Sequence, residues 1–127
     1  MVSDLFTLTL APAKEAARQA RSATTHFLRE LDMKELLDDA TLVVSELTTN
    51  ATKLGQKFRL RLIVNERTLR IEVSDHSVDE PIVRARIGDD RAEDGRGLLV
   101  VAALADAWGF DVLPDGGKTV WAVLTCR

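Results

Sequence analysis

The sequence is poor in cysteine and in long apolar runs. Its one cysteine, Cys126, can form neither an intrachain disulfide nor a multi-cysteine metal site, and this favours a reducing compartment. No apolar run approaches the ~18 residues that a membrane-spanning helix needs, and the opening stretch MVSDLFTLTL has no signal-peptide pattern. We therefore expect a cytoplasmic protein that does not associate with a membrane.

The sequence also has no large excess of positive or negative charge. The chain has 17 Lys and Arg against 20 Asp and Glu, a net charge of −3, and the two signs are interspersed. A basic surface of the kind that binds DNA or RNA is therefore not expected. Because 46% of the residues are hydrophobic and 29% are charged, the composition is that of a globular protein, and 127 residues can bury a real core. We expect one domain spanning residues 1–127.

The first 75 residues alternate between strand and helix patterns. LFTLTL (5–10) alternates apolar and polar residues, as expected of a strand. Residues 13–31 and 34–54 are rich in helix formers, and Gly55 is a suitable C-terminal cap for the second helix. Residues 57–75 alternate on both sides of an Asn-Glu-Arg turn, which predicts a hairpin with one apolar and one polar face.

The second half begins with a charged segment. Residues 76–96 have no sustained apolar period, and we expect them to form a long connection that acts as a lid. An apolar helix is expected over 97–109, followed by a closing hairpin around residues 115–117. The predicted architecture is α+β, with three helices on one face of a mainly antiparallel, mixed sheet.

The helix expected over 34–54 carries polar side chains close to its apolar stripe. At about 100° per residue, Asn50 projects inside the stripe and Glu46 lies at its edge, one turn earlier. A buried amide or carboxylate without a partner costs a few kcal/mol, so a protein group, water, a metal ion or a ligand should meet them. The stripe itself comprises Leu36, Ala40, Val43, Leu47, Ala51 and Leu54.

Three further stretches carry polar or glycine-rich signals. DGGKT (115–119) is not a phosphate-binding P-loop, because Val112 stands where that motif needs glycine and a strand pattern follows. In DGRGLL (94–99) two glycines open a predicted helix, so the stretch is either a site for an anion at the helix N-terminus or a flexible hinge. Asp75, at a strand end, is either a turn former or an acceptor for an exocyclic amino group.

Taken in order, these stretches resemble a known set of boxes. ELTTN (46–50), Asp75 in VSD, GRGLL (95–99) and GGKTVWAVL (116–124) follow the order and spacing of the ATP-binding boxes of the GHKL superfamily, which includes gyrase, histidine kinases and heat-shock chaperones. The whole chain is similar to the anti-sigma-factor serine kinases of bacterial partner switching. The resemblance implies a Bergerat-type two-layer sandwich that binds ATP between the helices and a lid.

The resemblance also implies roles for single residues. Asn50 would coordinate Mg²⁺ on the phosphates, and Glu46 would be the general base toward the hydroxyl or water that attacks the γ-phosphate. Asp75 would accept the adenine amino group, with Thr119 helping through its hydroxyl and a water. The end of the lid would give backbone donors to the phosphates through Gly95, Arg96, Gly97 and Leu98.

The implied function is that of an ATP-dependent serine/threonine protein kinase. It would phosphorylate an anti-sigma-factor antagonist and sequester a sigma factor, and the family makes a homodimer plausible. Ser77 stands where many relatives have glycine, so a second interpretation is a nucleotide-binding module that switches partners without phosphoryl transfer. A third interpretation is an α+β domain in which Asn50 forms its hydrogen bonds with other groups of the protein.

Overall fold

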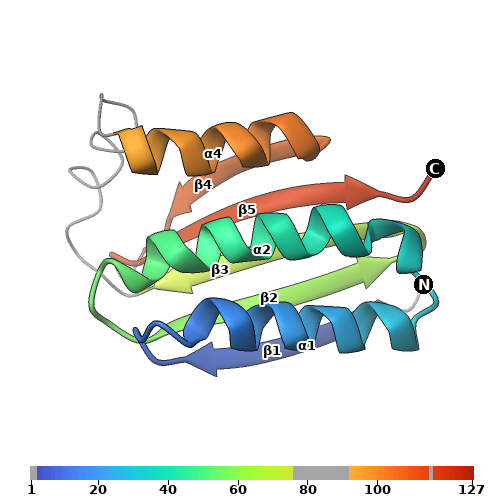
Figure 1. Cartoon of the computed structure of the whole chain (residues 1–127), viewed down its shortest axis with the longest axis horizontal. Helices are drawn as coiled ribbons and strands as arrows, with labels where there is room; N and C mark the ends of the chain where they lie inside the picture. Colours follow the sequence, from blue (N-terminus) through green and yellow to red (C-terminus); the bar gives the residue numbers. More distant parts are fainter. Residues whose placement is uncertain (1–2, 76–91, 115) are drawn as a thin grey trace.

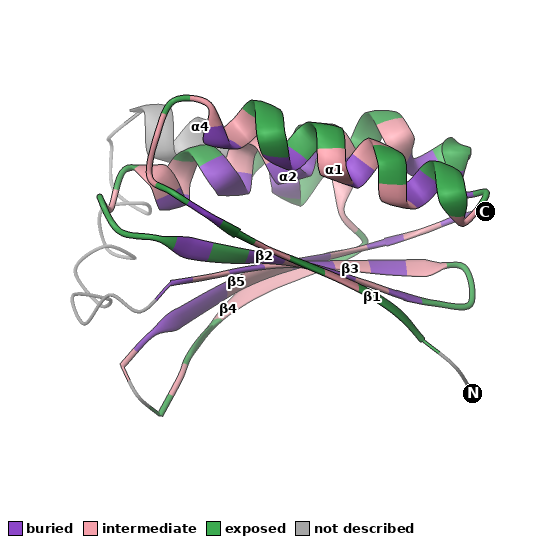
Figure 2. Ribbon diagram, turned by 90° about the horizontal axis from the view of Figure 1, so that it is seen from below, coloured by how far each residue is buried: buried purple, intermediate pink, exposed green. Residues whose placement is uncertain are grey.

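The chain folds into a sheet with helices on one face (Figures 1 and 2). This computed structural model describes residues 3–75, 92–114 and 116–127, with backbone alone for 92–97. The helices all lie on the same side of the sheet, and its other face carries no helix of the described chain. The predicted two-layer α+β architecture is confirmed.

The sheet has five strands in the order β1-β2-β3-β5-β4. Every pairing among the described strands is antiparallel, so the mixed component that we expected is not seen there. The β2–β3 hairpin closes through Glu66, whose φ of 61° is in the left-handed region, and Asn65 pairs with Thr68. The strands span Asp4–Leu10 (β1), Phe58–Asn65 (β2), Thr68–Asp75 (β3), Ala107–Val112 (β4) and Lys118–Thr125 (β5).

Helix α2 lies between the two other α-helices of the described chain (Figure 1). A short 3₁₀ turn precedes α2, and the Arg21 guanidinium donates to the Ser45 hydroxyl at 3.0 Å across the α1–α2 interface. No helix in the described ranges is long and apolar enough to cross a membrane. The helices span Ala16–Glu30 (α1), Lys34–Leu36 (the 3₁₀ turn, η1), Leu37–Thr52 (α2) and Ala92–Leu104 (α4).

The core lies between the helices and the sheet. Alternate residues of β2 and β3 are buried, as the two-residue period of a strand with one covered face requires. They meet the buried stripe of α2, which includes Ala40, Val43 and Leu47. The buried residues of the central hairpin are Phe58, Leu60, Leu62, Val64, Leu69, Ile71 and Val73.

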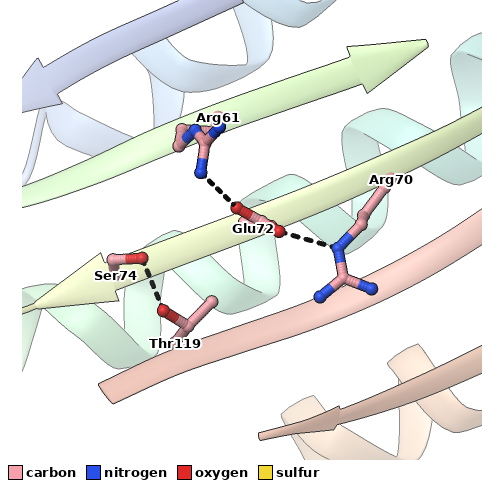
Figure 3. A network of polar contacts seen from close by, with 5 residues as sticks. All are labelled: Arg61, Arg70, Glu72, Ser74 and Thr119. Carbon is pink, nitrogen blue, oxygen red and sulfur yellow. Dashed lines mark hydrogen bonds and ion pairs between the residues drawn. The ribbon is translucent and has the colours of Figure 1, made fainter. Parts of the chain in front are cut away.

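The outer face of the sheet carries an ordered polar cluster (Figure 3). Glu72 accepts hydrogen bonds from Arg61 at 3.0 Å and from Arg70 at 2.7 Å. The Arg70 guanidinium also lies 4.5 Å from the centre of the Trp121 ring, a cation–π distance. The same ring packs on Gly109, where a Cβ atom would come within 2.9 Å of it. Glycine at this position therefore makes room for the tryptophan.

The apolar segment that follows the predicted lid does not form the single helix that we expected. We expected one helix over 97–109, but α4 spans Ala92–Leu104, and Trp108 and Gly109 belong to β4. The amide of Asp106 donates to the Val123 carbonyl at 2.8 Å, which starts the pairing of this segment with β5. A continuous apolar run does not reveal where a helix gives way to a strand. Of the predicted lid, residues 76–91 lie outside the described part, and 92–96 are helical.

Candidate functional site

Glu46 and Asn50 lie one turn apart on the same flank of α2. The buried stripe of the helix separates this flank from the one that carries Ser45, which bonds to α1. Because residues four apart share one side of a helix and α2 lies between α1 and α4 (Figure 1), the flank of Glu46 and Asn50 faces α4. Both side chains are half-buried. A carboxylate and an amide are thus presented side by side toward α4.

The burial of Asn50 was predicted wrongly. We expected it inside the buried stripe together with Leu54, but both are half-exposed, and Val44 and Thr48 are buried in their place. The stripe is rotated toward α1 because α2 packs against that helix as well as against the sheet. Within the described ranges, neither Asn50 nor Glu46 makes a side-chain hydrogen bond or ion pair. The interpretation in which a protein group satisfies Asn50 therefore finds no support in this part of the chain.

Asp75 is the last residue of β3 and is buried. Its cross-strand partner is Lys118, the first residue of β5. The Lys118 ammonium lies 3.4 Å from Asp75 Oδ1, and the two side chains are 3% and 7% exposed. Both face the helices, because Asp75 continues the alternation of buried Val73. The structure thus places an acceptor and a donor together beneath the helix layer.

Sequence reasoning missed Lys118. We assigned no role to this lysine, either in the rejected P-loop interpretation of DGGKT or in the ATP-binding box GGKTVWAVL. The two-residue alternation of KTVWAVL places Lys118 on the same face as Ala122 and Leu124, which are buried, and this signal was available. What the sequence does not reveal is the register that sets Lys118 opposite Asp75.

Thr119 lies on the other face of the sheet from Asp75. It pairs with Ser74, and the two hydroxyl oxygens are 2.8 Å apart (Figure 3). Successive residues of a strand point to opposite faces, so the Thr119 hydroxyl cannot act beside the Asp75 carboxylate as we predicted. Lys118 occupies the position that we assigned to Thr119.

The glycines of GRGLL lie within α4 and do not precede it. Since α4 begins at Ala92, the amides without a partner within the helix end with Asp94. The fourth residue of a helix already donates within it, as the Gln19 amide of α1 does to the Glu15 carbonyl at 3.0 Å. Gly95, Arg96, Gly97 and Leu98 therefore lie beyond the free amides of the α4 N-terminus, and Leu98 itself is a buried core residue.

The remaining candidate groups gather at one end of the molecule. The C-terminal halves of α2 and β3 meet there with the starts of α4 and β5 (Figure 1). A cavity of about 270 Å³ lies at the opposite end, between the start of α2 and the end of β5, and is lined by none of the predicted site residues. We assign the site from the chemistry of Glu46, Asn50 and Asp75, because the residues that line the cavity do not indicate a particular ligand.

A magnesium ion at this site would have to be held chiefly by a ligand. The described residues contain no group of three or more His, Cys, Asp or Glu side chains that could hold a metal. Mg²⁺ usually keeps several waters and binds through one or two protein oxygens plus substrate phosphates. The half-exposed amide oxygen of Asn50 suits such a partly protein-bound ion.

Comparison with known proteins identifies the domain. No curated protein matches the chain. Residues 10–124, however, match the family described as "Histidine kinase-like ATPase domain". The match runs from the last residue of β1 almost to the end of β5 and includes every candidate residue of the site. Such a domain implies ATP binding, as expected of a GHKL-like sandwich. The chain belongs to the histidine kinase-like ATPase domain family.

Proposed function

We propose that this protein is an ATP-dependent serine/threonine kinase whose substrate is an anti-sigma-factor antagonist. The observation that carries the proposal is the pair on α2: Glu46 and Asn50 are half-exposed, one turn apart and without a protein partner among the described residues. Phosphoryl transfer needs a group that accepts the proton of the nucleophile and a group that holds the metal-bound phosphates. A carboxylate and an amide oxygen supply these two requirements.

Glu46 acts in this proposal as the general base. The hydroxyl oxygen of the acceptor serine or threonine bonds to the γ-phosphorus, and the bond from that phosphorus to the β–γ bridging oxygen breaks, which releases ADP. The hydroxyl proton passes to the Glu46 carboxylate. A half-exposed carboxylate suits this role, because a partner's hydroxyl can approach it.

The other groups of the site bind and orient the nucleotide. Asn50 would hold Mg²⁺, which would neutralise the charge of the phosphates when bound. Asp75 would accept a hydrogen bond from the 6-amino group of adenine, and the amides of the first turn of α4 would donate to a phosphate oxygen. These contacts lie at the end of the molecule where α2, β3 and α4 meet.

The partners follow from the resemblance of the sequence boxes to the anti-sigma-factor kinases. The kinase would bind the unphosphorylated antagonist, phosphorylate it, and hold the sigma factor once the antagonist has left. The match of nearly the whole chain to a single ATPase domain is compatible with this small branch.

A second candidate is a nucleotide-dependent binding module without transfer. One observation favours it: among the described residues, no hydrogen bond orients the Glu46 carboxylate, whereas a catalytic base is usually held in place by another group. In this case nucleotide binding alone would select the protein partner.

Replacement of Glu46 by glutamine separates the two candidates. Glu46→Gln keeps the shape of the side chain but cannot take the proton, so transfer from γ-labelled ATP to the antagonist should fall on the order of 10²–10⁴-fold. The affinity for ATP, measured by calorimetry, should change little. Glu30→Gln, on exposed α1 surface, is the matched control.

Each result decides between the candidates. Equal transfer rates for Glu46→Gln and wild type would show that Glu46 is not the base. Wild type that binds ATP and antagonist but transfers no phosphate would favour the binding module.

A further inference from the structure

Lys118 carries more hydrogen-bond donors than the described residues use. Its ammonium has three N–H groups, and among these residues the Asp75 carboxylate is the one acceptor bonded to it, at 3.4 Å. Charge-assisted hydrogen bonds usually measure about 2.7–2.9 Å, so this contact is long. The side chain is nonetheless 3% exposed. Because buried polar groups are nearly always satisfied, the spare donors indicate that a bound molecule completes this position.

The position of Lys118 relates it to the base of the nucleotide. It lies beside Asp75, the residue proposed to accept the 6-amino group, and on the same face of the sheet. Both lie on the helix-facing side of the sheet and are 3.4 Å apart, so a base that reaches Asp75 also comes within reach of Lys118. The inference therefore rests on the proposed nucleotide site.

A carboxylate and an ammonium side by side can read two kinds of purine. In adenine the 6-amino group donates and the neighbouring N1 accepts, so Asp75 would accept a hydrogen bond from the amino group while Lys118 donates one to N1. In a 6-oxopurine the roles are reversed, because O6 accepts and N1–H donates. Lys118 would then donate to O6, and Asp75 would accept from N1–H. A carboxylate alone would repel O6, since both are acceptors.

We propose that Lys118 reads the nucleobase and extends this site from 6-aminopurine to 6-oxopurine nucleotides. Inosine triphosphate is the simplest such ligand, because it differs from ATP at position 6 and in the proton on N1. Purine riboside triphosphate, which has hydrogen at position 6, is the matched reference.

The first test uses wild-type protein and compares the dissociation constants of these three nucleotides with Mg²⁺. The dissociation constant of inosine triphosphate should lie within about tenfold of that of ATP. Both nucleotides should bind at least about tenfold more tightly than the reference, because this is the effect of one hydrogen bond to a charged group. Inosine triphosphate that binds no better than the reference would overturn the proposal. Absence of binding by all three would instead overturn the proposed nucleotide site.

The second test removes the ammonium. Lys118→Met should raise the dissociation constant of inosine triphosphate by on the order of 10²-fold. It should raise that of ATP by less, because Asp75 still accepts a hydrogen bond from the amino group. Lys57→Met, at an exposed lysine, should change neither affinity. Unchanged binding of inosine triphosphate by Lys118→Met, or tighter binding of ATP, would overturn the role of Lys118. If this variant does not fold, the wild-type comparison still decides.

Discussion

At the residue scale, Asp75 and Lys118 are two opposite charges that the fold withdraws from water. Their side chains are 7% and 3% exposed and 3.4 Å apart. Burial of such a pair is costly, and the mutual attraction offsets that cost only while both partners are present. The pair is therefore better explained by a function at this position than by a contribution to stability.

Because both charges are buried, replacing Lys118 alone should destabilise the protein more than replacing both members of the pair. Lys118→Met should lower the free energy of unfolding by about 3 kcal/mol, because it removes the ammonium that lies against a buried carboxylate. Asp75→Asn combined with Lys118→Met should recover part of this loss, because the double variant removes the buried negative charge together with the positive one. Urea denaturation measures each variant.

The matched control is Arg67→Met, which breaks the exposed pair with Glu35 and should cost less than about 1 kcal/mol. Equal losses for Lys118→Met and Arg67→Met would contradict the assignment of a buried charge pair.

At the element scale, α1 and α2 each bury one threonine completely. The Thr24 hydroxyl donates to the Ala20 carbonyl at 2.8 Å, whereas the Thr48 hydroxyl has no partner among the residues that the structure describes. Thr48→Val should therefore stabilise the protein or leave it unchanged, since it removes a buried polar group that is not satisfied, a gain of up to about 1 kcal/mol. Thr24→Val should cost about 1 kcal/mol because it removes a hydrogen bond.

Thermal and urea unfolding of the two valine variants provide the measurement. Since each change replaces a hydroxyl by a methyl group on a fully buried residue, their difference isolates the hydrogen bond. A larger loss for Thr48→Val than for Thr24→Val would contradict the assignment.

Patterns within single elements could be predicted from the sequence, and their boundaries and neighbours could not. The alternation of residues 57–75 predicted β2 and β3 correctly, because one covered face imposes a two-residue period. The run from Gly97 to Gly109 was misassigned, because pairing with β5, and not local composition, begins β4. The face of Thr119 could have been predicted, because the alternation of KTVWAVL places it opposite buried Ala122 and Leu124, but the register that sets Lys118 beside Asp75 depends on contacts far apart in the sequence.

The site was predictable in part. Glu46 and Asn50 lie in the C-terminal half of α2 and Asp75 ends β3, and these two segments lie at the same end of the molecule (Figure 1). The half-exposure of Asn50 was not foreseen, because it depends on how α2 is rotated between its neighbours.

At the scale of the whole molecule, the site lies where two layers meet and draws on four elements. In the proposed site, helix α2 supplies Glu46 and Asn50, β3 and β5 supply Asp75 and Lys118, and α4 supplies the amides of its first turn. A ligand that contacts all of them joins the helix layer to the sheet. Because it binds the native state alone, it should stabilise the protein by mass action, by about 2.7 kcal/mol at 100 times its dissociation constant.

The most direct test of this account is a calorimetric titration of the protein with Mg·ATP, followed by thermal unfolding at saturation. We predict a saturable heat and a melting temperature raised by several degrees, with both effects weakened in Asp75→Asn and retained in Asp111→Asn, an exposed aspartate of β4. The absence of heat and of any shift in melting temperature at millimolar Mg·ATP would contradict the account.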